Sequence, residues 1–383
     1  MKKCVGLLAS AGVCLPIMAS AAGPTLDDVL TNSGLTEAGH ISASYTGGFN
    51  KGQVLGYRAF DTDSNSFELN QAAFTLSKLP TEGFGGLVNV TAGSDAKVIN
   101  SSYGSGDGDF ALTQAYVQYA TGALTIIGGR YVTLAGAEVI DDSQDANVSR
   151  SLLFTLAEPL VHTGVRASYA ITGTTTAYLG INNSALSGDS LDGDKTKTVE
   201  TGLAYASADK KLGAAVYDYY GVDHSTKSNY LDLDLSYQLT DKLQLVANGD
   251  YFRFIGGSAL AEPGTAVAAP GGYAAGVAVY ANYQLTDQWK GSLRGEYLTT
   301  KDMLATPAES GKSSIAELTG TVGYNPVKSV TLLGEVRYDF SNTRVFPNPD
   351  LATFEVPGTD GDSLKDQGSV EVKAIYAFGN ASS

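Results

Sequence analysis

Residues 231–239 read LDLDLSYQL, and apolar and polar side chains alternate one by one along this stretch. Successive side chains of a β-strand point to opposite faces, so a strict period of two predicts a strand with one apolar face and one polar face. The same alternation occurs in 277–285 (VAVYANYQL), 289–297 (WKGSLRGEY) and 370–378 (VEVKAIYAF), where the charged side chains fall on one face. The sequence therefore predicts an all-β fold.

The connections between these segments alternate between short and long. Short turns with Gly, Pro, Asn or Asp chemistry lie at 121–123, 208–210, 240–242, 286–288 and 325–328. Long connections cover approximately 48–65, 97–109, 132–160, 184–196, 221–228, 255–271, 299–313 and 341–366. This pattern predicts a transmembrane antiparallel β-barrel of about 16 strands, with both chain ends on the side of the short turns.

A water-soluble β-sandwich is the alternative fold, because its strands also alternate. A sandwich needs dense Phe, Leu and Ile on its buried side, whereas the apolar face here is mostly Val, Ala, Leu and Tyr and often contains Gly. Tyrosines also lie near segment ends, where aromatic residues suit a lipid–water boundary. The residues expected in such girdles are Tyr119, Tyr131, Tyr205, Tyr219, Tyr237, Tyr283, Tyr297, Tyr324 and Tyr376. The composition favours the membrane barrel.

The first residues predict export. Lys2 and Lys3 precede a short apolar stretch, and Ala19-Ser20-Ala21 supplies a small-x-small cleavage pattern, so residues 1–21 are predicted to be a signal peptide. Residues 22–38 are then a short periplasmic segment with a small helix predicted at 24–32, and 39–379 are the barrel. Both cysteines, Cys4 and Cys14, lie in the signal. The expected location is the outer membrane of a Gram-negative bacterium.

Overall charge excludes one class of function. The 383 residues include 25 Lys and Arg against 40 Asp and Glu, a formal net charge of −15. A protein that follows a nucleic-acid backbone has to displace counterions with cations that this chain lacks. We therefore expect no nucleic-acid partner. The expected partners are outer-membrane lipid and small hydrophilic solutes or ions, and a homotrimer is an assembly to consider.

Several blocks in the first half of the chain resemble the OmpL-like putative beta-barrel porins of Gram-negative bacteria. They are 26–45 (LDDVLTNSGLTEAGHISASY), 64–80 (SNSFELNQAAFTLSKLP), 83–100 (GFGGLVNVTAGSDAKVIN), 114–119 (QAYVQY), 136–140 (GAEVI), 149–154 (SRSLLF) and 162–169 (HTGVRASY). The second half matches only as a generic barrel. The resemblance implies an outer-membrane porin and names no solute.

A barrel of this size encloses water, so its function depends on what narrows the lumen. By analogy with porins, we expect the third long connection, 132–160, to fold inward as a constriction. Its charged residues Glu138, Asp141, Asp142, Asp145 and Arg150 would then face Arg130 and Arg166 on the opposite wall. Such a transverse field favours polar solutes and gives a mild preference for cations. The alternative is an external surface loop or subunit contact.

Strand parity predicts further residues that line the lumen. The principal candidates are Asp232, Asp234, Asp250, Arg294, Glu296, Glu335 and Arg337, and Asp218 is predicted to point inward as well. Most of these side chains are acidic. For any one of them, local solvation of the channel wall is a more common role than a specific solute contact.

Catalysis and metal binding have weaker support. The histidines are His40, His162 and His224, and only Asp223-His224-Ser225 combines residue types that suit a hydrolase. Residues 104–109 (GSGDGD) could offer oxygen ligands to calcium but lack EF-hand spacing. We therefore expect no enzyme activity, no cofactor and no metal. A surface receptor or adhesin, and a hydrolase centred on His224, are the alternative functions.

Overall fold

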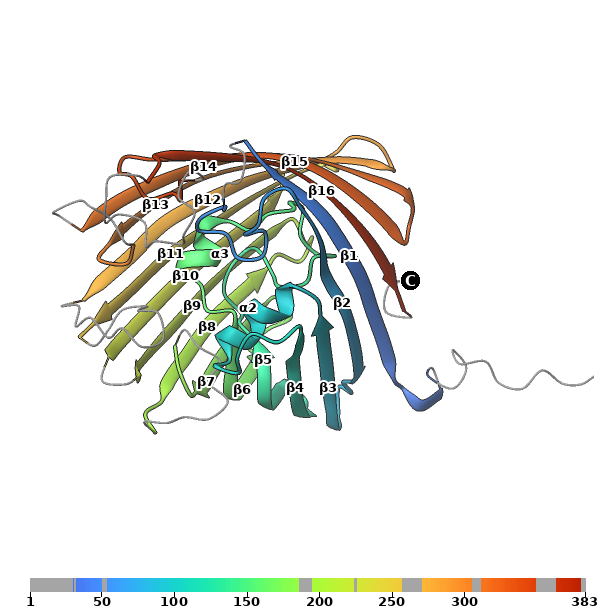
Figure 1. Ribbon diagram of the computed structural model, residues 1–383. Coiled ribbons are helices and arrows are strands. Elements are labelled where there is room, and N and C mark those ends of the chain that lie inside the picture. Colours follow the sequence, from blue (N-terminus) through green and yellow to red (C-terminus); the bar gives the residue numbers. More distant parts are fainter. Residues whose placement is uncertain are drawn as a thin grey trace, which may run out of the picture.

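The computed structural model describes residues 30, 32–49, 54–185, 195–223, 226–256, 271–304, 311–348 and 363–379. Its main feature is a closed barrel of sixteen antiparallel strands in which every strand pairs with its neighbours in sequence and β16 returns to β1 (Figure 1). The closing pair aligns Ile41 of β1 with Tyr376 of β16. The predicted fold class and strand number are confirmed.

The bounds of the strands are β1 Thr36–Gly48, β2 Ser66–Lys78, β3 Gly83–Ala92, β4 Phe110–Thr121, β5 Leu124–Val132, β6 Val161–Ala170, β7 Thr175–Asn182, β8 Thr198–Ala206, β9 Leu212–Asp223, β10 Thr226–Gln238, β11 Leu243–Ile255, β12 Gly272–Gln284, β13 Trp289–Lys301, β14 Lys312–Val327, β15 Val330–Ser341 and β16 Asp366–Phe378. The shortest strands are β5, β7 and β8, with 8 or 9 residues each.

The barrel boundaries differ slightly from those predicted. Strand β1 begins at Thr36, three residues earlier than expected, because Thr36 already pairs with Ser77 of β2. The turn expected at 325–328 is shifted, because β14 continues to Val327 and has an irregularity after Tyr324. The signal peptide at 1–21 and most of the helix expected at 24–32 lie outside the described residues.

Period-two alternation determines which side chains face out. On β10, Leu233 and Leu235 are exposed on the outer surface, whereas Asp232 is fully buried inside. The outer surface carries a broad belt of exposed Leu, Val, Ile, Phe and Tyr side chains. A contiguous apolar belt of this extent on a closed barrel is the surface that lipid covers.

The girdle assignment is right for some tyrosines and wrong for two. Six of the nine are exposed, Tyr324 is half-buried, and Tyr131 and Tyr219 are fully buried in the lumen; the exposed six are Tyr119, Tyr205, Tyr237, Tyr283, Tyr297 and Tyr376. The phenol of Tyr131 donates to Asn182 Oδ1 at 2.5 Å, and the ring of Tyr219 stacks on His162 with centroids 4.8 Å apart. These two rings therefore support the inner wall.

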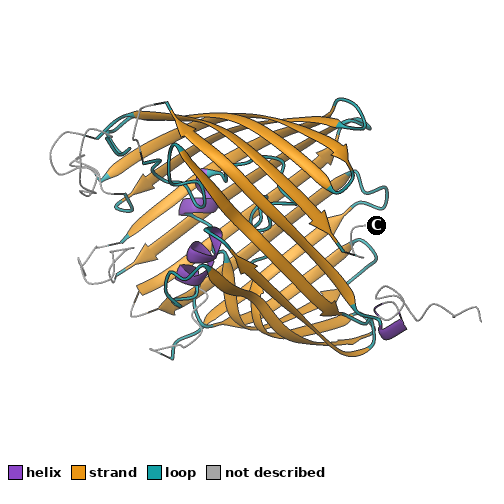
Figure 2. Ribbon diagram, turned by 45° about the vertical axis from the view of Figure 1, so that its right-hand side comes forward, coloured by secondary structure: helices purple, strands orange, loops and turns teal. Residues whose placement is uncertain are grey.

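Two helices in the long connections fold into the barrel (Figure 2). Helix α2 (Asp95–Ser102) follows β3 and packs mainly against β4, and α3 (Leu152–Leu156) precedes β6 and contacts β12 and β13. The side chain of Ser151 accepts a hydrogen bond from Phe154 N at 3.0 Å and so caps α3. Neither helix was predicted from the sequence.

An apolar core lies inside the barrel at the level of α3. Leu152 and Leu153 pack in one buried cluster with inward-facing side chains of the wall and of the last long connection. The wall and loop members include Phe252, Phe254, Ala274, Leu298, Ile315, Val345 and Phe346. Burial of these side chains fixes the loop inside the lumen, since each large apolar side chain contributes about 1.5–3 kcal/mol on burial.

Candidate pore constriction

The third long connection lies inside the lumen and is docked on the β13–β15 wall through its backbone. Glu296 accepts the N–H groups of Leu152 and Leu153, both at 2.6 Å. Glu335 accepts those of Val148 and Ser149 at 2.7 and 3.0 Å. These are charge-assisted bonds in a buried setting, where an unpaired N–H would be costly. Two wall carboxylates therefore hold residues 148–153.

Two wall arginines hold the same segment from the side. The guanidinium of Arg294 donates to Glu138 at 2.6 Å, to the Ser149 carbonyl at 2.7 Å and to Glu317 at 2.9 Å. Arg337 donates to the carbonyl of Arg150 at 2.5 Å and to Asp339 at 2.8 Å. Both arginines have no exposed surface. The planar five-donor guanidinium suits this bridging between loop carbonyls and wall carboxylates.

Asp142 and Asp145 share one arginine of their own loop. The Arg150 guanidinium lies 3.0 Å from a carboxylate oxygen of each, and Asp142 is also 3.0 Å from Lys373 on β16. Burial alone would raise the pKa of Asp142, but Lys373 and Arg150 outweigh it and hold that pKa below the usual range. Asp145 forms no second salt bridge among the described residues, and burial outweighs the charge of Arg150 and raises the pKa of Asp145 to about 7.

The structure does not place the acidic residues of the loop opposite Arg130 and Arg166, as was expected from the sequence. Arg166 pairs with Glu200 on β8 at 2.6 Å and lies over the Tyr131 ring, and Arg130 lies over Tyr103. The loop acids take Arg294, Arg150 and Lys373 as partners instead. A buried charged group needs an opposite charge in direct contact. These loop acids therefore form ion pairs with neighbouring groups instead of facing an opposite charge across a water-filled gap.

The remaining predicted lumen residues mostly lie inside the barrel. Asp232, Asp250, Arg294, Glu296, Glu335 and Arg337 are buried there, and Asp234 lines an inner cavity. Asp218 is the exception, because the β9–β10 register pairs it with the outward-facing Leu231. Asp141, also predicted at the constriction, is partly exposed and lies 3.3 Å from His40 Nδ1.

Sequence reasoning missed a second docked segment. Arg58, in the first long connection, is buried and pairs with Asp61, and it lies 3.3 Å from Asp339 of β15 and from Glu371 of β16. A signal was present in the sequence, since Arg58 is the only basic residue between Lys51 and Lys78. An isolated cation in a loop that faces an acidic wall is a candidate for docking.

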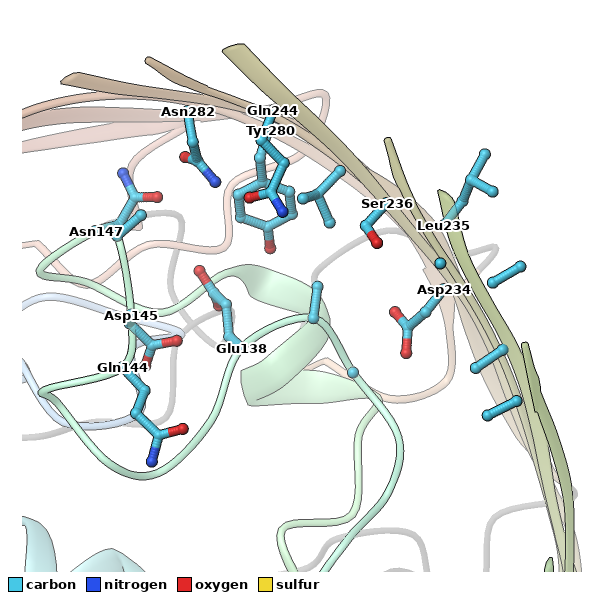
Figure 3. Close-up of a pocket in the computed structure, with 18 of the residues that line it drawn as sticks. Glu138, Gln144, Asp145, Asn147, Asp234, Leu235, Ser236, Gln244, Tyr280 and Asn282 are labelled. Atoms are coloured by element: carbon cyan, nitrogen blue, oxygen red, sulfur yellow. The ribbon is translucent and has the colours of Figure 1, made fainter. Parts of the chain in front are cut away.

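The inward loop borders two large cavities at the end of the lumen nearest the short turns. One, of about 460 Å³, lies against β8–β12 and includes Asp234, Ser236, Gln244 and Tyr280 (Figure 3). We call it the β8–β12 cavity. The other, of about 430 Å³, lies against β1–β4 and includes His40, Gln71 and Thr113. Gly136, Glu138 and Gln144 line both cavities, so this part of the loop is the partition.

The candidates for other chemistry are placed as follows. His40 and His162 are buried in β1 and β6, and His224 with Ser225 lies outside the described residues. Asp109 of the 104–109 stretch lies 3.3 Å from Lys97, and both side chains are largely exposed. In the described ranges no group of three or more His, Cys, Asp or Glu is arranged to hold a metal ion. No described helix has the length and apolar character needed to cross a membrane.

A closed sixteen-stranded barrel with an apolar outer belt, a polar interior and an inward-folded third loop defines an outer-membrane barrel of the porin type. This chain belongs to the family described as putative beta-barrel porin-2, OmpL-like, whose sequence profile matches residues 34–378. The match includes the second half of the chain, where the quoted blocks gave no specific resemblance. No curated protein sequence matches the chain.

Solved structures share the fold at low sequence identity. OmpT, an outer membrane protein of Vibrio cholerae, superposes with a TM-score of 0.59 at 12% identity, covering 90% of this chain and 97% of that one. The outer membrane channel DcaP of Acinetobacter baumannii gives 0.56 at 16%, covering 90% and 96%. An anion-selective porin from Comamonas acidovorans gives 0.57 at 11%, covering 90% and 99%. At this identity the likeness is one of fold.

Proposed function

We propose that this protein is a passive diffusion channel for small hydrophilic solutes or ions with a preference for cations. The observation that carries the proposal is the charge of the interior. Among the described residues, buried acidic side chains outnumber buried basic ones by more than two to one. A lumen with excess negative charge concentrates cations and repels anions.

The geometry supports passage by diffusion past a partition. The two cavities near the short turns are lined by neutral polar groups such as Gln144, Ser236 and Thr113 as well as by carboxylates. These groups exchange hydrogen bonds with water and polar solutes, whereas an apolar solute would displace water without replacing its interactions. The fold alone does not set the sign of selectivity, because an anion-selective porin shares it.

Planar-bilayer recordings test the proposal. Purified protein is inserted into a planar bilayer with KCl at about 1 M on one side and about 0.1 M on the other. The zero-current potential is then measured. The potential is expected to have the sign of K⁺ preference and to move toward zero in Asp141→Asn, whose carboxylate lines the β1–β4 cavity. Asp287→Asn, on an exposed turn, is the matched control. Anion preference, or insertion without current, contradicts the proposal.

Three further assignments belong to this proposal. The signal peptide at 1–21 delivers the chain to the outer membrane, with the short turns on the periplasmic side. A homotrimer is the proposed assembly, supported by the trimer form recorded for Vibrio cholerae OmpT. The chain acts as a channel and not as an enzyme, and a hydrolytic activity that disappears in His224→Ala would overturn this last assignment.

A further inference from the structure

Three aspartates on adjacent strands form an acidic cluster inside the barrel. The β10–β11 register places Asp232 opposite Asp250 and Asp234 opposite Asn248. Asn248 donates to Asp232 Oδ1 at 2.7 Å, and the Tyr230 hydroxyl donates to Asp250 Oδ1 at 2.8 Å. One oxygen of each aspartate, and Asn248 Oδ1, is buried without a hydrogen-bond partner in the described structure. The cluster has more acceptors than donors.

Glu158, in the inward loop, lies beside these aspartates and provides independent evidence for a site. Its side chain is 8% exposed, and both of its carboxylate oxygens are buried without a partner among the described residues. The carboxylate lies directly against Gly136, where φ is +90° and a Cβ would collide with it. The backbone of Gly136 also faces the Asp232 carboxylate. Glu158, Asp232, Asp234 and Asp250 are called the carboxylate cluster below.

The buried arginines of the lumen that pair with carboxylates have partners outside this cluster. Arg294 pairs with Glu138 and Glu317, Arg150 with Asp142 and Asp145, and Arg166 with Glu200. Burial, together with the charges of Asp250 and Asp232, raises the pKa of Glu158 well above its usual value. Four carboxyl groups with unfilled acceptors and no paired cation therefore lie together in the described part of the lumen.

We propose that the carboxylate cluster binds the primary ammonium group of a small solute. An ammonium group carries positive charge and three N–H donors and has no acceptor, and its charge would favour the ionised form of these carboxyl groups, whose oxygens then act as acceptors. A metal ion fits less well, because metal–oxygen bonds of about 2.3–2.6 Å need a tighter set of ligands than N–H···O bonds of about 2.9 Å. No such tight set exists among the described residues.

Access comes from the β8–β12 cavity. Asp234 lines this cavity together with Gly136 and Glu138, and Asp232 lies two residues further along β10. A solute in the cavity therefore meets Asp234 first and the buried members of the cluster next. The site deepens the proposed function, since it gives the cation-preferring channel a solute class, and the inference rests on that function for its physiological meaning.

Binding at equilibrium is the direct test, and it does not depend on conduction. The thermal unfolding midpoint of the full-length protein is measured in detergent micelles with methylammonium chloride or tetramethylammonium chloride at equal concentration. The two cations carry the same charge, but the second has no N–H donor. Methylammonium is expected to raise the midpoint by a few degrees relative to tetramethylammonium, because a ligand that binds only the folded state stabilises it.

Variants assign the effect to the cluster. The difference between the two cations is expected to disappear in Asp232→Asn with Glu158→Gln, and to persist in Asp287→Asn, an exposed turn residue. Asp232→Asn alone replaces the double variant if the latter fails to show the β-sheet circular dichroism of the folded barrel. Equal midpoints in the two cations for the unmodified protein, or an undiminished difference in the cluster variant, overturn the inference.

Bilayer currents separate this site from the channel proposal. A protein that conducts K⁺ with cation preference but shows no methylammonium effect in micelles keeps its proposed function and loses the site. A protein that shows the methylammonium effect but gives no current keeps the site as a binding site and loses the channel. The two proposals therefore fail independently.

Discussion

The guanidinium of Arg294, on the β13 wall, lies 2.6 Å from the carboxylate of Glu138 in the inward loop. This pair joins residues 156 positions apart in the sequence and is buried in the lumen. It belongs to a set of buried contacts that determine where the partition between the two cavities stands.

Replacement of Arg294 is expected to release the inward loop. Arg294→Ala leaves Glu138 and Glu317 buried without their cation, a change that typically costs about 3–5 kcal/mol. The loop is then expected to leave the β13 wall, which raises the single-channel conductance measured in planar bilayers. Arg253→Ala, on the exposed outer face of β11, is the control. An unchanged conductance in Arg294→Ala would show that the loop is held without this pair.

Asp145 is expected to make stability depend on pH. Folding raises its pKa to about 7, so the folded state binds this proton more tightly than the unfolded state does. Stability from this group is therefore greatest below about pH 4, falls as the pH rises toward 7, and is constant above. The fall is of the order of a few kcal/mol. Denaturant unfolding in micelles at pH 5 and pH 8 should show it in the unmodified protein and a reduced fall in Asp145→Asn.

Asp142, in the same loop, is expected to change stability with pH in the opposite direction. Its pKa is lowered on folding, so its contribution is present above the ordinary carboxyl range and is lost as the pH falls through the lowered value. Asp142→Asn is expected to destabilise the protein at pH 7, because it leaves Lys373 with one carboxylate fewer. Equal pH profiles for the Asp142 and Asp145 variants would contradict the assignment of separate roles.

Gly136 is expected to tolerate no side chain. Gly136→Ala places a Cβ against Glu158 at a φ of +90°, and strain of this kind costs about 1–3 kcal/mol. Denaturant unfolding of the refolded barrel measures the loss. Gly295→Ala is the matched control, because its Cβ would meet no atom within 4 Å and its φ lies outside the left-handed region. A loss of similar size in both variants would argue against the contact.

The outer belt is expected to reject charge in proportion to its depth in the membrane. Leu318, near the middle of β14, is 63% exposed on the outer face. Leu318→Lys should destabilise the barrel by about 2–4 kcal/mol when it is folded into lipid vesicles. Gln288→Lys, in a short turn, should change the free energy of unfolding little. A small effect at Leu318 would mean that lipid does not cover this face.

Sequence alone determined the barrel and its two faces. Alternation such as LDLDLSYQL commits each side chain to the lipid or the lumen, because the strand period is two and local, and the spacing of turns then gives the strand number. The same rule predicted inward positions for Asp232, Arg294, Glu296 and Arg337, and their side chains are buried in the structure. It failed at Asp218 and Tyr219 in the middle of β9, because Tyr217 and Tyr219 take the inward positions there and leave Asp218 on the outer face.

Only the tertiary structure decided which charges meet. Arg294 and Glu138, or Lys373 and Asp142, lie on segments that the sequence separates widely, and their pairing depends on how the loop folds across the lumen. Local sequence patterns carry no information about the path of this loop. Two tertiary features determine it: Leu152 and Leu153 are buried against the wall, and the backbone N–H groups of the loop donate hydrogen bonds to buried wall carboxylates. The partition, the two cavities and the unpaired carboxylate cluster all follow from this path.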